Sequence, residues 1–382
     1  MKISIFLSFL FSLLLQQHDL FAQEFVLDFR ENLVIGEADH DSLEYLFSGI
    51  RTIRPLPDGR ILVADASEPS IRVFNQNGIF VKKIGQRGRG PGDFRVVTSI
   101  EIGNDESIIV LDRMQERISF FDHDGNYTHA HMLQGQTLGT LQFAFYRDRQ
   151  NDFLLAYRDY MNAHLNGHYL HLYDQSFEAK ESSHLDLFEH FFDSSKPFEI
   201  QVSLQPRYLA TRYGVNHIAV VPKIYTGTIF SLDDHDLSER QIGAHINDFY
   251  TLHDILDSEK YFNSGMAGFG TTSGQHGRYL YRVKGTNIGL VGNSRFLLHF
   301  YVLHQDKDMI PYLTVYSACG KLLANISLVN FLINFIKNDV ISIVPHFLDE
   351  ENNLYTSDYY YMNASPAVRV FKTNLNELLD HE

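Results

Sequence analysis

The sequence predicts an all-β fold built from repeated antiparallel sheets, and an internal repeat is the first reason. Residues 50–84 and 97–131 follow one plan at a constant offset of 47 positions. Periods of about 40–50 residues, each with about four short strands, are typical of propeller blades. Composition is the second reason, because aromatic residues make up 13% of the chain and pack well on pleated sheets. The matching positions are Ile53 and Ile100, Val63 and Val110, Asp65 and Asp112, Ile71 and Ile118, Phe74 and Phe121, and Gly78 and Gly125.

The first repeat divides into four expected strands. Pro57–Gly59 forms a turn in which the glycine permits a positive φ, and Asn75–Gly78 forms a polar hairpin turn. The connection 85–94 has four Gly and one Pro in ten residues, so it is too flexible for a helix and leads into the next repeat. The expected strands are 48–56, 60–64, 70–74 and 80–84.

Weaker copies of this pattern fill the rest of the chain, so we predict a single six-bladed β-propeller with four antiparallel strands per blade. Residues 368–371 restore the Ile-Arg-Val-Phe of the first blade. Residues 24–36 alternate like a strand, and we expect them to pair with the last blade, because a closed ring avoids an unpaired edge. The expected blades are 48–84, 97–133, 141–183, 207–243, 278–328 and 339–379.

Two connections between blades are long. Residues 184–206 and 245–277 contain apolar residues at helical spacing, so short helices are expected, and residues 266–277 are rich in glycine and expected to be mobile. Long insertions on a rigid scaffold often carry binding sites. They serve equally well as caps that exclude water from the ring, and both interpretations stay open.

The stretch from the first linker onward resembles a known family. GQRGRGPGDF, then IIVLD and RISFFDHDG, is similar to the NHL-repeat, TolB-like type of six-bladed β-propeller over residues 50–131. The resemblance implies the fold more than an activity, because this scaffold serves protein binding, ligand binding and several enzymes. Related propellers include lactone hydrolases and an amidating lyase with a channel metal. No residue of this chain can be matched to those metal ligands.

The first 22 residues predict export. Residues 1–22 contain one Lys, an apolar run of 13 residues and Leu20-Phe21-Ala22, as in a secretory signal peptide cleaved after Ala22. No later window holds 18 apolar residues, so residues 23–382 are expected as one soluble domain in the periplasm or outside the cell. Cys319 is the only cysteine, which excludes an intramolecular disulfide. Low cysteine content with this leader suggests a bacterial source, and we expect a monomer.

The repeated Asp and Arg are expected to be structural. Asp65 and Asp112 end second strands, and Arg72 and Arg117 follow on the third. A carboxylate facing an arginine across a tight loop would hold that loop. Because the Asp recurs in each clear blade, we interpret it as part of the scaffold.

The candidate ligand-binding residues are those expected at one mouth of the channel. Linkers and second-to-third-strand loops emerge on the same side, because successive strands are antiparallel. Arginines there can clamp a carboxylate or phosphate, or equally form a solvated rim with local salt bridges. The candidates are Arg87, Arg89, Arg113, Arg158, Tyr160, His164, Lys223, Tyr225, His304 and Tyr359.

The motifs and charge favour binding over catalysis. No GxSxG or HExxH occurs, no catalytic residue can be named, and no cofactor or metal site is predicted among the 19 His. A net charge of −15 argues against nucleic acid. We therefore expect binding of a protein, peptide or small polar ligand at one channel face. Two alternatives stay open: a lactonase- or lyase-like enzyme using calcium or zinc, and a sensor or anchoring component with a large apolar patch.

Overall fold

The computed structural model describes twelve parts of the chain. The predicted signal peptide and the connection 184–206 lie outside them. The described residues are 27–36, 42–133, 141–147, 152–157, 170–174, 176, 208–244, 249–264, 266–274, 277–331, 340–360 and 366–379.

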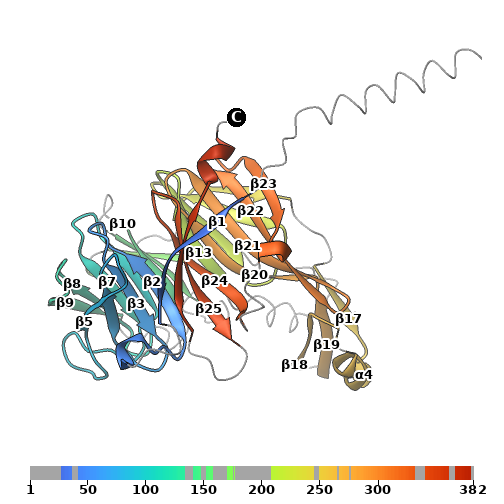
Figure 1. Cartoon of the computed structure of the whole chain (residues 1–382). Coiled ribbons are helices and arrows are strands. Elements are labelled where there is room, and N and C mark those ends of the chain that lie inside the picture. Colours follow the sequence, from blue (N-terminus) through green and yellow to red (C-terminus); the bar gives the residue numbers. More distant parts are fainter. Residues whose placement is uncertain are drawn as a thin grey trace, which may run out of the picture.

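Six antiparallel sheets form a six-bladed β-propeller, which confirms the predicted fold class (Figure 1). Five sheets have four described strands, and the third blade has three in the part of the chain described. The first strands of the blades line the centre, where β2 contacts β6 and β24, and β20 contacts β13 and β24.

The strands of the ring follow in chain order. Blade 1 is β2 (Ile50–Pro55), β3 (Ile61–Asp65), β4 (Ile71–Phe74) and β5 (Phe80–Ile84). Blade 2 is β6 (Ser99–Ile102), β7 (Ile108–Asp112), β8 (Arg117–Phe121) and β9 (Tyr127–Met132). Blade 3 is β10 (Leu141–Arg147), β11 (Asp152–Tyr157) and β12 (Leu170–Asp174). Blade 4 is β13 (Tyr208–Tyr213), β14 (His217–Pro222), β15 (Thr228–Asp233) and β16 (Glu239–Gly243). Blade 5 is β20 (Gly285–Gly292), β21 (Phe296–Gln305), β22 (Asp308–Ser317) and β23 (Leu322–Ser327). Blade 6 is β24 (Val340–Leu348), β25 (Asn353–Tyr360), β26 (Val368–Thr373) and β1 (Phe29–Ile35); the 3₁₀ turn η1 (Leu43–Tyr45) follows β1 and η4 (Leu375–Leu378) follows β26.

The amino-terminal strand closes the ring. β1 pairs antiparallel with β26, from Phe29 opposite Thr373 to Ile35 opposite Val368. This confirms the predicted closing strand, and it supplies the fourth strand that blade 6 would otherwise lack. The pairing covers an edge that would be open to association with another chain.

The core lies between the blades. Second and third strands such as β3 and β8 are buried at every residue, because each blade is covered on both faces by its neighbours. One apolar cluster joins Leu62 and Val73 of blade 1 to Val110 and Phe121 of blade 2 through Phe94 of the linker. The outer strand β5 instead alternates between exposed and half-buried residues.

The long connection after blade 4 forms a small sheet, which the sequence analysis did not predict. β17 (Tyr250–His253), β19 (Gly277–Val283) and β18 (Phe269–Gly274) pair antiparallel in that order, with η3 (Ile255–Asp257) and the short helix α4 (Ser258–Asn263) between β17 and β18. The expected helix is therefore a single short one. The glycine-rich stretch expected to be mobile is largely strand, because the Thr271 and Thr272 positions pair with β19. This sheet projects from the ring (Figure 1).

Blade 5 consequently begins at Gly285, later than the expected residue 278. Residues 277–283 pair with β17 and β18 and not with β21. The long β21–β22 hairpin holds the small sheet, since Ala267 N donates to Asp306 O at 2.9 Å and Arg282 Nη2 donates to the same oxygen at 3.3 Å.

In the described ranges, no helix has both the length and the apolar character needed to cross a lipid bilayer.

Candidate functional site

The two ends of the channel are built from different connections. We call the end formed by the turns between first and second strands the turn face. The opposite end, which carries the inter-blade linkers and the loops between second and third strands, is the linker face. Each end takes its chemistry from loop residues, because the strands between them are committed to the core.

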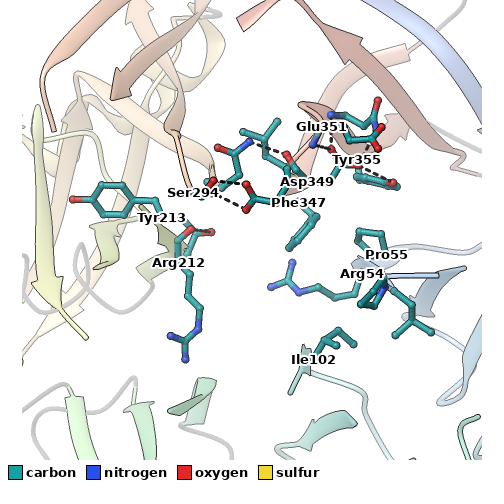
Figure 2. A pocket seen from close by; sticks show the side chains of 18 of the residues that line it. Arg54, Pro55, Ile102, Arg212, Tyr213, Ser294, Phe347, Asp349, Glu351 and Tyr355 are labelled. Atoms are coloured by element: carbon teal, nitrogen blue, oxygen red, sulfur yellow. Dashed lines mark hydrogen bonds between the residues drawn. The ribbon is translucent and has the colours of Figure 1, made fainter. Parts of the chain in front are cut away.

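A cavity of about 1020 Å³ opens on the turn face. Its walls come from the ends of first strands and the following turns in blades 1, 2, 4, 5 and 6. Figure 2 shows Arg212 and Tyr213 on one side of it, and Arg54, Phe347 and Tyr355 on the other. The described stretches that line it include 54–59, 101–102, 211–217, 292–294 and 347–351, with Asn32, Leu33, Ile61, Gln76, Asn104, Asp234, Asn353, Tyr355 and Val370.

Arg54 joins three blades at the wall of the cavity. Its Nε donates to Ile100 O at 3.0 Å, its Nη1 to His346 O at 3.0 Å and its Nη2 to Glu101 Oε1 at 3.3 Å. The guanidinium also lies 4.9 Å from the centre of the Phe347 ring. All these contacts use the charged head, so Arg54 is a structural tie whose flank faces the cavity.

His346 lies beside this tie and is neutral. Burial, and after it the charge of Arg54, lowers the pKa of His346 to about 3. Its Nε2 is 2.8 Å from Ser357 Oγ on the adjacent strand. A neutral imidazole fits here because protonation would place a second cation beside the Arg54 guanidinium.

The second arginine of the cavity is also paired. Arg212, at the end of β13, places Nη1 2.7 Å from Asp234 Oδ2. Asp234 belongs to the turn between β15 and β16. It also lines the cavity.

The turn of blade 6 supplies three carboxylates. Asp349 accepts hydrogen bonds from Asn353 N at 2.8 Å and Glu351 N at 2.9 Å, which shape the turn. Glu350 accepts from Ser294 N of blade 5 at 3.0 Å and from the Ser294 hydroxyl. Burial, and after it the charge of Asp349, raises the pKa of the Tyr355 phenol, so that group is neutral.

Acidic groups outnumber basic ones around the cavity. The lining contains two guanidiniums, each hydrogen-bonded to a carboxylate, so neither adds an uncompensated positive charge. A negative lining repels anions and favours neutral or cationic ligands. The six carboxylates of the lining are Asp58, Glu101, Asp234, Asp349, Glu350 and Glu351.

The residues predicted to bind a ligand lie elsewhere. Arg87 and Arg89 are exposed on the linker between blades 1 and 2, and Arg113 is half-buried in the following loop of blade 2. None of these three lines the cavity. Arg158, Tyr160 and His164 lie outside the described residues, and Tyr359 lies on β25.

Tyr225 and Lys223 lie where blade 4 meets blade 5. The Tyr225 ring stacks on Tyr301 at 4.1 Å between centroids, and burial raises the pKa of Tyr225. The Lys223 carbonyl accepts a hydrogen bond from Asn287 N at 2.7 Å. His304 instead lies between blade 5 and the small sheet, with Nδ1 3.1 Å from Val283 O and Nε2 3.1 Å from Thr286 Oγ1. These residues do not meet the arginines of blades 1 and 2 in one site.

The repeated aspartates hold loops, by a mechanism different from the expected one. Asp65 accepts from Ser48 N at 2.8 Å, before the first strand, and from Ser67 N at 2.8 Å, after the second. Asp112 accepts from Arg95 N at 2.6 Å in the equivalent place. Each carboxylate therefore ties a linker to the next loop through backbone N–H groups.

The repeated arginines bind carbonyl oxygens and not these aspartates. Arg72 donates to Leu46 O at 2.6 Å, and Arg117 donates to Gly90 O at 3.0 Å and to Asp93 O. The expected Asp–Arg pair occurs in blade 6, where Arg369 Nε is 2.8 Å from Asp358 Oδ2. All three arginines are scaffold groups.

Across the described residues, no three His, Cys, Asp or Glu side chains are grouped so that they could hold a metal ion.

Sequence reasoning missed the cavity residues because turn chemistry concealed them. Asp58, Asp349 and Asn293 have the ordinary signature of residues that cap turns through their own side chains. One sequence signal was that Arg54 and Arg212 are the penultimate residues of the first strands β2 and β13.

Comparisons with known proteins agree with this architecture. The family model of DUF5128, described as "6-bladed beta-propeller", matches residues 42–242, just over half of the 382 residues. No curated protein matches the sequence.

Solved structures share the fold at low identity. A Bacteroides fragilis protein to which export is ascribed has a TM-score of 0.55 at 14% identity, covering 91% of this chain and 95% of its own. A member of the DUF4221 family from Bacteroides vulgatus has 0.54 at 10% identity, covering 91% and 98%. Virginiamycin B lyase from Staphylococcus aureus has 0.46 at 8% identity, covering 91% and 99%, which is too distant to support an argument. By its sequence and by its six sheets, the chain belongs to the DUF5128 family of six-bladed β-propellers.

Proposed function

We propose that this protein is an exported propeller that binds a polar ligand or a peptide segment in the turn-face cavity, without catalysing its conversion. The observation that supports this most is the cavity itself, at about 1020 Å³ and lined from five blades. Sites for small molecules are usually concave and about 300–1,000 Å³ in volume. A site shared by several blades is pre-formed, because the ring holds its walls.

The lining favours a neutral or cationic ligand with hydrogen-bonding groups. Carboxylates such as Asp349 and Glu350 keep free lone pairs after satisfying their turns, since each oxygen can accept more than one hydrogen bond. Phe347 offers aromatic surface on one side of the cavity (Figure 2). An amine-bearing small molecule or a basic peptide segment matches this combination.

Export rests on the leader at residues 1–22. In a bacterial host that secretes the full-length chain, we expect the mature protein to begin at Gln23. Intact-mass measurement of protein taken from the periplasm or medium would check this, and an uncleaved mass found only in the cytoplasm would contradict it.

The cavity can be tested by ligand screening with matched variants. Amines, amino acids, neutral sugars and short basic peptides would be screened by thermal unfolding, and affinities of those that bind measured by calorimetry. Arg212→Ala changes the cavity wall, whereas Arg87→Ala removes the same charge from the linker face. Because Arg212→Ala removes a positive charge from the wall of a negative cavity, we expect it to strengthen the binding of a cationic ligand about tenfold, or about 1.4 kcal/mol. Arg87→Ala should leave the affinity unchanged.

Two results would contradict the proposal. One is a screen in which no compound stabilises the protein. The other is a bound cation whose affinity changes in Arg87→Ala and not in Arg212→Ala.

A further inference from the structure

Five arginines gather on the linker face around blades 1 and 2. They lie on the first strand of blade 1, on the linker that follows it, and in the loop after β7, while the chain as a whole carries a net charge of −15. All are exposed except one, which is half-buried. The five are Arg51, Arg87, Arg89, Arg95 and Arg113.

These guanidiniums differ from the other arginines of the same blades. Arg54, Arg60 and Arg72 each form an ion pair with a carboxylate. Within the described part of the chain, none of the five does so. Arg87 donates to Ser67 O at 2.8 Å, and the guanidiniums of the other four form no hydrogen bond to another described group.

Three carboxylates of this face are already engaged by other groups. Asp65 and Asp112 are 2% and 0% exposed and accept several loop N–H groups each. Glu68 pairs with Arg72 at 2.9 Å and Lys83 at 2.8 Å. None of these three carboxylates therefore forms an ion pair with the five arginines.

Arg51 and Arg113 both lie beside first strands, which line the channel. Arg51 is exposed and stands at the bulge of β2, the innermost strand of its blade. Arg113 is fixed beside the neighbouring first strand, because its N–H lies 3.3 Å from Thr98 Oγ1. Desolvation, and next the charge of Arg113, lowers the pKa of Arg51, whereas Asp65 acts in the opposite direction. Because β2 contacts β6, the bulge that holds Arg51 and the loop that holds Arg113 lie at the same end of two neighbouring first strands.

We propose that Arg51 and Arg113 form a binding site for an oxyanion, a carboxylate or phosphate group of a ligand, at the linker end of the channel. A guanidinium presents parallel N–H groups that match either anion in a forked geometry. One anion between the two would replace their repulsion with two attractions. Arg87, Arg89 and Arg95 strengthen the positive field that draws the anion to this end.

The test compares unfolding midpoints in different anions at one ionic strength. Wild type, Arg51→Gln/Arg113→Gln and Arg30→Gln/Arg278→Gln would be melted at pH 7 in sodium chloride, sodium phosphate and sodium citrate. The second pair removes the same charge from exposed positions elsewhere and also corrects for general salting-out by phosphate and citrate. We expect phosphate or citrate to raise the midpoint of wild type and of the control by about 3 °C more than that of Arg51→Gln/Arg113→Gln.

If the midpoint of wild type rises above that of Arg51→Gln/Arg113→Gln in phosphate only, the ligand group is a phosphate. If it does so in citrate only, the ligand group is a carboxylate. In low-salt chloride, Arg51→Gln/Arg113→Gln should melt at or above the wild-type temperature, because it removes a repulsion. Arg51→Lys/Arg113→Lys keeps the charge but not the fork, and should retain part of the anion effect. Equal anion effects in wild type, Arg51→Gln/Arg113→Gln and Arg30→Gln/Arg278→Gln would overturn the proposal. A melting temperature of Arg51→Gln/Arg113→Gln below that of wild type in low-salt chloride would also overturn it.

Discussion

The two ends of the channel have opposite chemistry on one repeated scaffold. At the turn face, six carboxylates surround two arginines that are both hydrogen-bonded to acids. At the linker face of blades 1 and 2, exposed arginines have no acidic partner among the described residues, and the nearby acids are held by loop N–H groups. The repeat therefore determines the strands and the aspartates that hold the loops. It does not determine the charge of the remaining loop residues, which differs between the two ends.

The largest expected effect concerns Arg369, a largely buried arginine on the linker side of blade 6. It tests whether this arginine stabilises the fold, in contrast to the exposed arginines of blades 1 and 2. Arg369 is 2.8 Å from Asp358 and 2.5 Å from Glu31 of the closing strand. Burial by itself would lower the pKa of Arg369, but Asp358 and Glu31 outweigh burial, so the pKa is raised. Asp358→Ala should lower the free energy of unfolding by about 3–5 kcal/mol, because it leaves a largely buried cation poorly paired. Chemical denaturation would measure this, and a loss below about 1 kcal/mol would mean that the pair does not hold blade 6.

The next prediction compares two arginines on one strand. Arg54 holds β6 and β24 at the turn end of β2, whereas Arg51 stands at the other end. We expect Arg54→Ala to cost about 2–4 kcal/mol, since it removes charged hydrogen bonds and an aromatic contact. Arg51→Ala should stay within about 0.5 kcal/mol of wild type. Similar losses in both would abolish the distinction between a structural and an unengaged arginine.

A smaller effect, counted per pH unit, is the dependence of the free energy of unfolding on pH. Burial lowers the pKa of His299 to about 3, and that of His346 to about 3 with a contribution from Arg54. The unfolded chain therefore binds more protons between about pH 6.5 and 3, so stability is full above pH 6.5 and falls as the pH drops through that window. Each histidine contributes up to about 1.4 kcal/mol per pH unit. His346→Gln should flatten this slope relative to wild type, and an unchanged slope would show that His346 is already protonated in the fold.

The blades could be predicted because their signals are local. The offset of 47 positions located blade 2, alternating strands and Gly-containing turns located the four strands of blade 1 within two residues, and alternation identified β1 as the closing strand. The small sheet β17–β18–β19 could not be predicted in this way. Its strands are short, and its register depends on contact with the β21–β22 hairpin, which no local pattern encodes.

The candidate cavity could not be predicted for a different reason. Its residues are turn formers such as Asp58 and Asp349, whose side chains first satisfy their own backbone. Only the closed ring brings turns from five blades around one space. The arginine-rich linker was visible in the sequence, but the lack of acidic partners for Arg51 and Arg113 depends on Asp65 and Asp112 being occupied by loop N–H groups.

The contrast between the two ends can be measured directly by anomalous diffraction from crystals soaked in bromide. Bromide reports where an anion is stabilised without requiring the natural ligand. Our account places a bromide peak beside Arg51 and Arg113 at the linker end, and none among the carboxylates of the turn-face cavity. A peak inside the cavity, or no peak at the arginine pair, would contradict it.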